Sequence, residues 1–195
     1  MGKSKFLELP PRSFKEELTR KWTIEETVIA SIIGAIFGAL AAVMGPLMFG
    51  PFQLRLCDSL DLIVYDRKYG GRAAMVGLLI SPFIVNMFSP YGGIVDSMLG
   101  LISGIITFSL VWWFGIKFKG SNWGKFIAGM TVVLIAQFFV AYILLYVMFG
   151  VPFWEAQGGV FVGDFVSIVV IGIPLLKALE MTYRKKVSEN AAKRK

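Results

Sequence analysis

The sequence predicts an all-α integral membrane protein with six transmembrane helices, of which the second is short, and with both termini in the cytoplasm. Two observations lead to this fold class. First, 56% of the 195 residues are hydrophobic and the mean hydropathy is +0.68, which is typical of membrane proteins rather than of soluble domains. Second, the charged residues gather in short blocks that separate long apolar runs. Such runs are typical of membrane-spanning helices.

Five apolar runs have about the length of a helix that crosses the ~30 Å of hydrocarbon in a bilayer. Four of them contain almost no charge, and these are 27–49, 73–88, 94–116 and 126–149. The fifth, 160–179, carries only Asp164 and Lys177. Together the runs predict a six-helix membrane domain over 27–180, flanked by basic cytoplasmic tails over 1–26 and 181–195.

The first tail contains a pattern that is typical of an amphipathic helix. Ser13 and Glu16 have the spacing of a capping box. Phe14, Leu18 and Trp22 recur at intervals of four residues, which favours a helix lying on the inner membrane surface. A solvated tail fits the same residues, so both interpretations stay open.

The segment 53–65 decides how often the chain crosses the membrane. It is apolar on part of its surface but contains Arg55, Asp58 and Asp61, and as an α-helix it would reach only ~20 Å. If it crosses, all of the 20 Lys and Arg residues except Arg55 fall on one side of the membrane. Basic residues concentrate on the cytoplasmic side of membrane proteins. Five crossings would separate the charges less cleanly, and we therefore predict six.

Five acidic residues fall toward the outer side in this topology: Asp58, Asp61, Asp96, Glu155 and Asp164. An ionisable residue at the centre of a span costs about 2.5 to 3.5 kcal/mol, so such residues usually face a cavity or a partner. Their convergence from several segments predicts one cavity with an excess of negative charge. A solute with positive charge or several N–H donors would suit it. Asp61 and Glu155 also fit positions on the surface.

The predicted solute-binding residues are Gln53, Arg55, Asp58, Asn86, Asp96 and Asp164. The carboxylates would accept N–H donors, while the two amides and Arg55 would hold a carbonyl or a ring nitrogen. A stacking surface is predicted at Phe52, Tyr91, Phe153 and Trp154. Purely structural roles are open alternatives: Asp96 and Asp164 could complement helix dipoles, Arg55 and Asp58 could neutralise each other, and the aromatic residues could form an interface belt.

The first apolar run carries a ribbon of small residues. It consists of Ala30, Gly34, Gly38 and Ala42 at four-residue intervals, flanked by Ser31, Ala35 and Ala39. Small residues let another helix approach closely, which is how membrane helices associate. We expect an interface with a separate coupling protein at Ser31, Gly34, Ala35, Gly38 and Ala39. Packing within the chain itself is the open alternative.

Residues 50–60 read Gly-Pro-Phe-Gln-Leu-Arg-Leu-Cys-Asp-Ser-Leu. This segment resembles the pattern G-P-[IF]-Q-[FL]-R-[IV]-S-E-A-L of the queuosine-precursor transporter (QueT) family. The likeness continues through 74–88, 93–96, 162–164 and 172–176, and covers about residues 28–180. The chain departs from the family pattern at Cys57 and Asp58, which replace Ser and Glu, and at Asp164, which replaces Glu.

The resemblance implies a substrate-binding S component of an energy-coupling-factor (ECF) transporter. Such a subunit lies in the prokaryotic cell membrane and captures a 7-deazapurine precursor of queuosine from outside. Its implied partners are a transmembrane coupling protein and two ATPase subunits, and a small-residue motif on the first helix meets the coupling protein. The two shortened carboxylates imply a resized pocket, so the ligand of this chain stays open.

Other functions are compatible with parts of the sequence. An S component for another vitamin-like or purine-like solute and a self-sufficient secondary carrier are the alternatives, since intramembrane acids also serve as ion relays. The absence of a Walker A motif argues against ATP hydrolysis by the chain itself. With no His and only Cys57, the sequence favours neither a metal site, a cofactor nor an enzyme. The basic residues lie in tails and short loops, which disfavours nucleic-acid binding.

Overall fold

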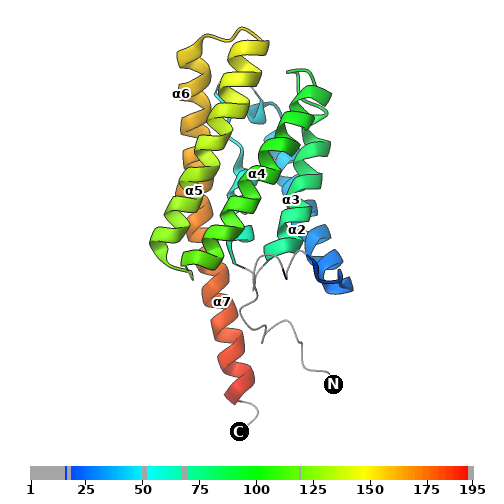
Figure 1. Ribbon diagram of the computed structural model, residues 1–195, viewed down its shortest axis with the longest axis vertical. Coiled ribbons are helices and arrows are strands. Elements are labelled where there is room, and N and C mark those ends of the chain that lie inside the picture. The colour runs from blue at the N-terminus through cyan, green and yellow to red at the C-terminus, as the bar shows by residue number, and fades with distance from the viewer. Residues whose placement is uncertain (1–15, 17–18, 50–51, 67–69, 119, 193–195) are drawn as a thin grey trace.

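The computed structural model describes residues 16, 19–49, 52–66, 70–118 and 120–192 (Figure 1). All regular secondary structure in these residues is helical. The elements are α2 (Ile24–Met44), η2 (Gly45–Met48), η3 (Leu56–Tyr65), α3 (Gly71–Asn86), α4 (Ile94–Phe118), α5 (Asn122–Ala136), η4 (Gln137–Met148), α6 (Phe153–Asp164), η5 (Phe165–Gly172) and α7 (Ile173–Ala192). The chain therefore forms an elongated helical bundle.

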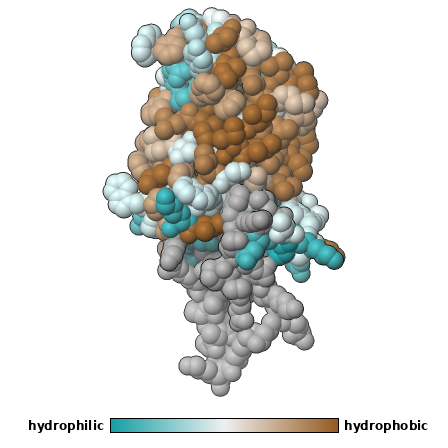
Figure 2. Space-filling view, viewed as in Figure 1, coloured by the Kyte–Doolittle hydropathy of each residue, from teal (hydrophilic) through white to brown (hydrophobic). Residues whose placement is uncertain are grey.

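Four helical stretches are long and apolar enough to cross a membrane: Ile24–Met44, Ile94–Phe118, Asn122–Met148 and Phe153–Tyr183. Their mean hydropathy is between 2.0 and 2.3. Large apolar side chains such as Ile36, Ile102 and Leu134 are exposed on their outer surfaces, and Figure 2 shows hydrophobic residues in a broad band across one face. Lipid can cover such a surface without cost, whereas water cannot. The chain is a multi-pass membrane protein.

The helices α2 and α3 run in the same direction. Ala30 lies against Gly77, where a Cβ atom would collide with the Ala30 carbonyl oxygen, and one turn further Gly34 lies against Ser81. The Ser81 hydroxyl donates a hydrogen bond to the Gly34 carbonyl oxygen at 3.0 Å. Because α2 and α3 are parallel neighbours, the chain between them must return along the whole length of the bundle.

The element η3 makes this return through the interior. Gln53, before η3, lies against Gly163 of α6, and Tyr65, at its end, lies against Gly115 of α4 and Gly124 of α5. Every residue of η3 from Ser59 to Tyr65 is buried. The predicted short second helix is thus a 3₁₀ helix, which at ~2 Å per residue covers ~20 Å in ten residues. Runs of 3₁₀ helix this long are uncommon and often mark a functional segment.

The two ends of the bundle differ in charge. One end, which we call the basic end, holds the starts of α2, α3 and α5 and the end of α4, with Arg72, Lys117 and Lys125. The opposite end holds the turns between α3 and α4 and between η4 and α6, where the rings of Tyr91 and Phe149 meet edge to face. In Figure 1 the start of α2 lies at the basic end, and α7 leaves the bundle at the same end.

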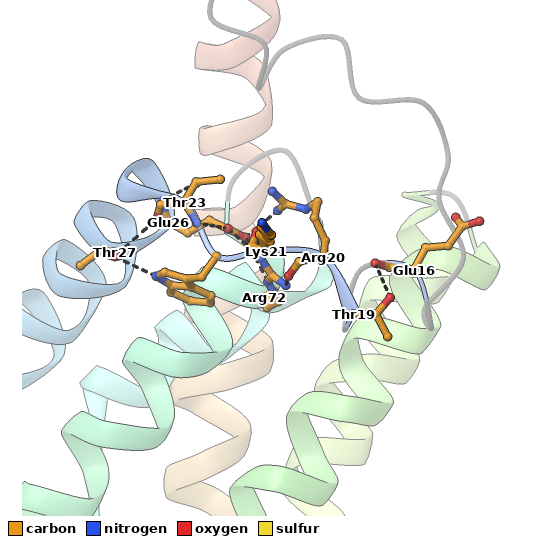
Figure 3. Close-up of polar contacts among 9 residues, drawn as sticks. Glu16, Thr19, Arg20, Lys21, Thr23, Glu26, Thr27 and Arg72 are labelled. Carbon is orange, nitrogen blue, oxygen red and sulfur yellow. Dashed lines mark hydrogen bonds and ion pairs between the residues drawn. The ribbon is translucent and has the colours of Figure 1, made fainter.

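A buried ion cluster joins α2 to α3 at the basic end (Figure 3). Thr23 caps α2 and forms a capping box with Glu26. The Glu26 carboxylate, whose side chain is only 3% exposed, accepts hydrogen bonds from Arg72 Nε at 3.1 Å and from Arg72 Nη2 at 2.7 Å. It also pairs with Arg20 at 2.7 Å. Arg72 further donates to the carbonyl oxygens of Arg20 and Lys21, which fastens the segment before α2 onto α3.

A second buried ion pair joins α5 to α7 at the same end. The Lys125 ammonium group lies 2.6 Å from the Glu180 carboxylate, and the Lys125 side chain is only 2% exposed. Below this pair α7 continues away from the bundle to Ala192 (Figure 1), so the predicted tail over 181–195 is helical as far as the structure describes it.

The predicted amphipathic helix around Phe14 and Leu18 lies outside the described residues. Its third member, Trp22, precedes the Thr23 cap of α2 in a non-helical stretch. The Trp22 indole N–H donates to the Thr27 hydroxyl at 2.8 Å, and its ring lies 5.0 Å from the Arg72 guanidinium.

Candidate solute-binding site

A cavity of about 90 Å³ lies inside the bundle beside η3. It has room for several water molecules, since one water needs roughly 10 to 15 Å³ on this measure. Its lining residues come from the segment 53–61 and from α3, α4, α5, η4, α6 and η5. The polar side chains among them are Gln53, Arg55, Asp58, Asp61, Asn86, Ser103, Thr107 and Asp164. Five of the six predicted binding residues thus meet in one cavity.

The 3₁₀ geometry of η3 aligns three of the charged residues. A 3₁₀ helix has three residues per turn, so side chains three apart in the sequence stand directly above one another. Arg55, which precedes η3, is followed at this spacing by Asp58 and Asp61. All three line the cavity. In an α-helix the same row would turn away by ~60° at each step, because three residues fall short of a full turn.

Arg55 and Asp58 form an ion pair at the start of this row. Arg55 Nε lies 3.0 Å from Asp58 Oδ2, and both side chains are largely buried. Although this distance is short, the Arg55 Nε atom makes no well-aligned hydrogen bond with any described residue. The Cys57 thiol donates to the other carboxylate oxygen of Asp58 at 3.6 Å. The pair is therefore an electrostatic contact that leaves part of the guanidinium's donor capacity unused.

Asn86 and Asp164 approach the cavity from α3 and α6. Asn86 is 2% exposed, and its Oδ1 atom has no hydrogen-bond partner among the described residues. Asp164 is 3% exposed and follows Gly163, where a Cβ atom would collide with the carbonyl oxygen of Gln53. Glycine at this position therefore lets the segment before η3 lie directly on α6, which brings Asp164 next to Gln53 and Arg55.

Two π-helical segments of the described residues begin at the cavity wall. Ala136 directly precedes η4 and Val140 lies in its first turn, while Asp164 directly precedes η5 and Ile168 lies in its first turn. Departures from α-helical winding of this kind frequently occur at functional sites, because they re-aim the side chains of one turn. Here they face the cavity from two neighbouring helices.

Asp96, the sixth predicted residue, is buried but does not line the cavity. It lies in the first turn of α4 and is 5% exposed. It is near enough to Arg55 to interact with it electrostatically. This position also suits a carboxylate that complements the helix dipole of α4.

The four aromatic residues predicted to form a stacking surface do not line this cavity. Phe52 and Trp154 are 76% and 82% exposed, and neither they nor Tyr91 and Phe153 are among the lining residues. Phe108 of α4 lines it instead. Exposed aromatic residues at the end of a span are typical of an interface belt, which was the alternative interpretation.

Sequence reasoning left three polar lining residues out of the site: Asp61, Ser103 and Thr107. Asp61 was one of the outer acids but also fitted a surface position, whereas in the structure it is 9% exposed. The signal that could have placed it is its spacing of three from Asp58, which in turn lies three from Arg55. Glu155, the other acid with a surface alternative, is exposed.

Comparison with known protein families matches residues 27–181 to the family described as QueT transporter. The chain belongs to the QueT transporter family. No curated protein and no solved structure matches it significantly. Family membership makes the chain a membrane transporter rather than an enzyme, and it confirms the resemblance carried by residues 50–60 and the segments that follow.

In this QueT family member the small-residue ribbon of α2 is divided between two sides. Ala30 and Gly34 pack against α3, as described above, so internal packing accounts for that edge. Ser31, Ala35 and Ala39 are exposed on the surface of the bundle, one turn apart. Gly38 lies between the two edges, and a Cβ atom there would meet no other atom within 4 Å.

Proposed function

We propose that this chain is the substrate-binding subunit of an ECF-type ATP-driven uptake transporter, and that its solute is a 7-deazapurine precursor of queuosine. The observation that carries the proposal is the buried polar cavity at Gln53, Arg55, Asp58, Asn86 and Asp164, inside the membrane bundle of a QueT family member. A buried polar cavity is costly in a membrane protein unless a ligand uses it.

The chemistry of the cavity wall suits a 7-deazapurine. Such a base presents ring and exocyclic N–H donors on one edge and a carbonyl oxygen beside them. Carboxylates and the Asn86 Oδ1 atom, which has no partner among the described residues, accept the donors, and Arg55 donates to the carbonyl. The cavity is small beside the ~300 to 1,000 Å³ of pockets for larger ligands, which favours a compact, flat solute.

The proposed topology has six crossings with both termini in the cytoplasm. The path of η3 along the bundle supports counting it as a crossing, and the basic end then faces the cytoplasm, as the distribution of Lys and Arg favours. The cavity lies toward the other end, beside the first turns of η3, so the proposal has the solute enter from outside.

The proposed partners are one transmembrane coupling protein and two ATPase subunits. The exposed row Ser31, Ala35 and Ala39 on α2 offers a surface without large side chains, on which a helix of the coupling protein would pack closely. Gly34 and Gly38 would contribute to this interface mainly because they have no side chains, so that a neighbouring helix can come close to the α2 backbone.

Binding by the purified chain is the first test. Mass spectrometry of co-purified small molecules should detect a 7-deazapurine, and calorimetry should show binding of 7-deazaguanine precursors but not of flavin, thiamin or biotin. Replacing both members of the ion pair, Arg55→Ala with Asp58→Ala, should weaken binding by about 100-fold or more, because two hydrogen bonds between charged groups and the solute are lost, each worth roughly 1.5 to 3 kcal/mol. Glu155→Gln, at an exposed acid, is the matched control. If a vitamin binds and the deazapurine does not, the proposed identity of the solute is contradicted.

Transport by proteoliposomes is the second test. Accumulation of the solute should require a coupling protein, two ATPase subunits and ATP. Accumulation driven by a proton or sodium gradient with this chain alone would instead identify a secondary carrier and overturn the ECF assignment.

A further inference from the structure

The last turn of α3, which carries Asn86, is separated from the rest of the helix by a proline. Up to this point α3 contacts α2 closely through Gly77 and Ser81. The next residue, Pro82, has no N–H to donate to the carbonyl oxygen of Leu78, so one helical hydrogen bond is missing there. Asn86 lies one turn beyond this interruption. Its position is therefore not fixed by the hydrogen bonding of α3 alone.

The helix α2 does not support this last turn. Beyond Gly34 the two helices separate, and an apolar groove of about 770 Å³ lies between them. Its walls include Gly38 and Ala42 of α2, Ile84 and Val85 of α3, and Phe88 just after α3. A Cβ atom at Gly38 would meet no other atom within 4 Å, whereas one at Gly34 would collide with Ser81. Close packing between α2 and α3 thus ends before Asn86 is reached.

The helix α4 supports the end of α3 through Ser97. This residue is fully buried, and its hydroxyl donates a hydrogen bond to the Phe83 carbonyl oxygen at 2.8 Å. In a continuous α-helix that carbonyl would accept from the Met87 N–H. Because α3 ends at Asn86, the Met87 N–H donates to the Ile84 carbonyl oxygen instead. The Ser97 hydroxyl therefore ties the last turn of α3 to α4.

Gly100, about one turn further along α4, lies against the Asn86 side chain itself. A Cβ atom at this position would be only 2.9 Å from Asn86 Nδ2, so the amide would have to move. Both residues line the cavity. The Oδ1 atom of the same amide is buried without a hydrogen-bond partner among the described residues. The missing side chain of Gly100 thus leaves room for the amide in the place from which Oδ1 can accept a donor of the solute.

We infer that Ser97 and Gly100 of α4 are positioning residues, which act on the solute through Asn86. Ser97 fixes the helix turn that carries Asn86, and Gly100 fixes where its amide group lies. The inference rests on the proposed function, because the solute is taken to bind in this cavity. Since both residues act through one amide, their effect on affinity should disappear when that amide is removed.

A double-mutant cycle with Asn86→Ala tests the inference, with calorimetry on 7-aminomethyl-7-deazaguanine as the solute. In the otherwise unchanged chain, Ser97→Ala and Gly100→Ala should each weaken binding by about 3- to 10-fold, because the hydrogen bond from the solute to Asn86 becomes misaligned. In the Asn86→Ala chain, each should change the dissociation constant by less than about twofold, because residues that act through one contact are not additive.

Ser81→Ala is the matched control. It also removes one hydrogen bond from a serine hydroxyl to a helix carbonyl oxygen, at 3.0 Å, but it lies before Pro82. The melting temperature should fall about as much as in Ser97→Ala, while the dissociation constant should change by less than about twofold. Gly100→Ala removes no side-chain hydrogen bond, so it decides the question if Ser97→Ala proves too unstable to purify.

The possible results separate this inference from the proposed function. Unchanged affinity in Ser97→Ala or Gly100→Ala, or effects that persist in full in the Asn86→Ala chain, would overturn the positioning role and leave the proposed function in place. A loss of affinity in Ser81→Ala as large as in Ser97→Ala would do the same, since it would indicate general loosening of α3. If the wild type binds no 7-deazaguanine precursor, the proposed function is overturned and this inference with it.

Discussion

Buried charges occur in two regions of this protein, and the regions differ in how completely the charges are matched. At the basic end, Glu26 meets Arg72 and Arg20 at 2.7 Å, and Lys125 meets Glu180 at 2.6 Å. Around the cavity, one guanidinium faces three carboxylates, and the Asn86 Oδ1 atom has no partner among the described residues. The first region joins α2 to α3 and α5 to α7, whereas the second joins no pair of helices by an ion pair.

The difference indicates two separate uses of buried charge. A matched pair in a low-dielectric setting contributes to stability mainly because removing one partner strands the other. An unmatched group lowers the stability of the ligand-free protein, and the bound ligand restores that stability by pairing with the group. This arrangement is usual at functional sites. Acid-to-amide substitutions should therefore have opposite signatures in the two regions.

The largest effect on stability is expected from Glu26→Gln. The amide cannot neutralise Arg72 and Arg20, so the free energy of unfolding should fall by about 3 kcal/mol or more. Thermal unfolding in detergent would measure the loss, and the affinity for the solute should stay within about twofold of the wild type. Glu25→Gln, at the exposed neighbour, is the control. If the Glu25 and Glu26 variants unfold at the same temperature, the cluster in Figure 3 does not hold the helices together.

A similar but somewhat smaller loss is expected from Lys125→Met. It strands the Glu180 carboxylate, which is 14% exposed and so partly relieved by solvent, and we expect a cost of about 2 to 3 kcal/mol. Adding Glu180→Leu should restore most of the melting temperature, because an apolar pair often replaces a buried ion pair without loss. A double variant as unstable as the single one would show that packing rather than charge dominates at this position.

In the cavity, Asp164→Asn should reduce solute affinity without reducing stability. The lost charge-assisted hydrogen bond corresponds to about 10- to 100-fold in the dissociation constant. The melting temperature of the solute-free protein should stay the same or rise, since no ion pair to Asp164 is lost. Asp164→Glu, which restores the residue usual in the family pattern, should retain binding. A melting temperature lowered as much as in Glu26→Gln would abolish the contrast between the two regions.

The smallest effect is expected from Asn86→Ala. Its Oδ1 atom has no partner in the residues that the structure describes, so we expect about 5- to 10-fold weaker binding, equivalent to roughly one neutral hydrogen bond to the solute. Calorimetry on the variant and on Ser81→Ala, which loses only the hydrogen bond between α2 and α3, separates a ligand contact from a structural one. An unchanged dissociation constant would remove Asn86 from the site.

Much of the fold follows from the sequence because a membrane-spanning helix can be recognised from one continuous run of apolar residues. The apolar run 94–116 corresponds to α4 at Ile94–Phe118, and the run 126–149 corresponds to Asn122–Met148. The second of these helices starts four residues before its apolar run, since a cap such as Ser121 and a polar first turn are tolerated outside the hydrocarbon.

The site was only partly predictable for a different reason. Acids on several segments had to converge because a lone charge in a span is costly, and this argument correctly brings Asp58 and Asp164 together with Arg55. Whether Asp61 joins them depends on the winding of η3, because its spacing of three from Asp58 aligns the two side chains only in a 3₁₀ helix. The sequence likewise does not tell which residues of the α2 ribbon are packed inside the bundle. Only the position of α3 decides that Gly34 is packed inside while Ala35 is exposed.

By itself the sequence determined that this is a multi-pass helical membrane protein of the QueT type, where its main spans lie, and which charges have to be sheltered. These properties depend on the free energy of transfer of each side chain from water into lipid, which is set by the residue type alone. Only the tertiary structure decided that the second helix is 3₁₀, that Arg55, Asp58 and Asp61 form one row, and that Asn86 holds beside them an acceptor with no partner in the described part of the chain. Those features arise from packing between segments distant in the sequence, and no local pattern contains that information.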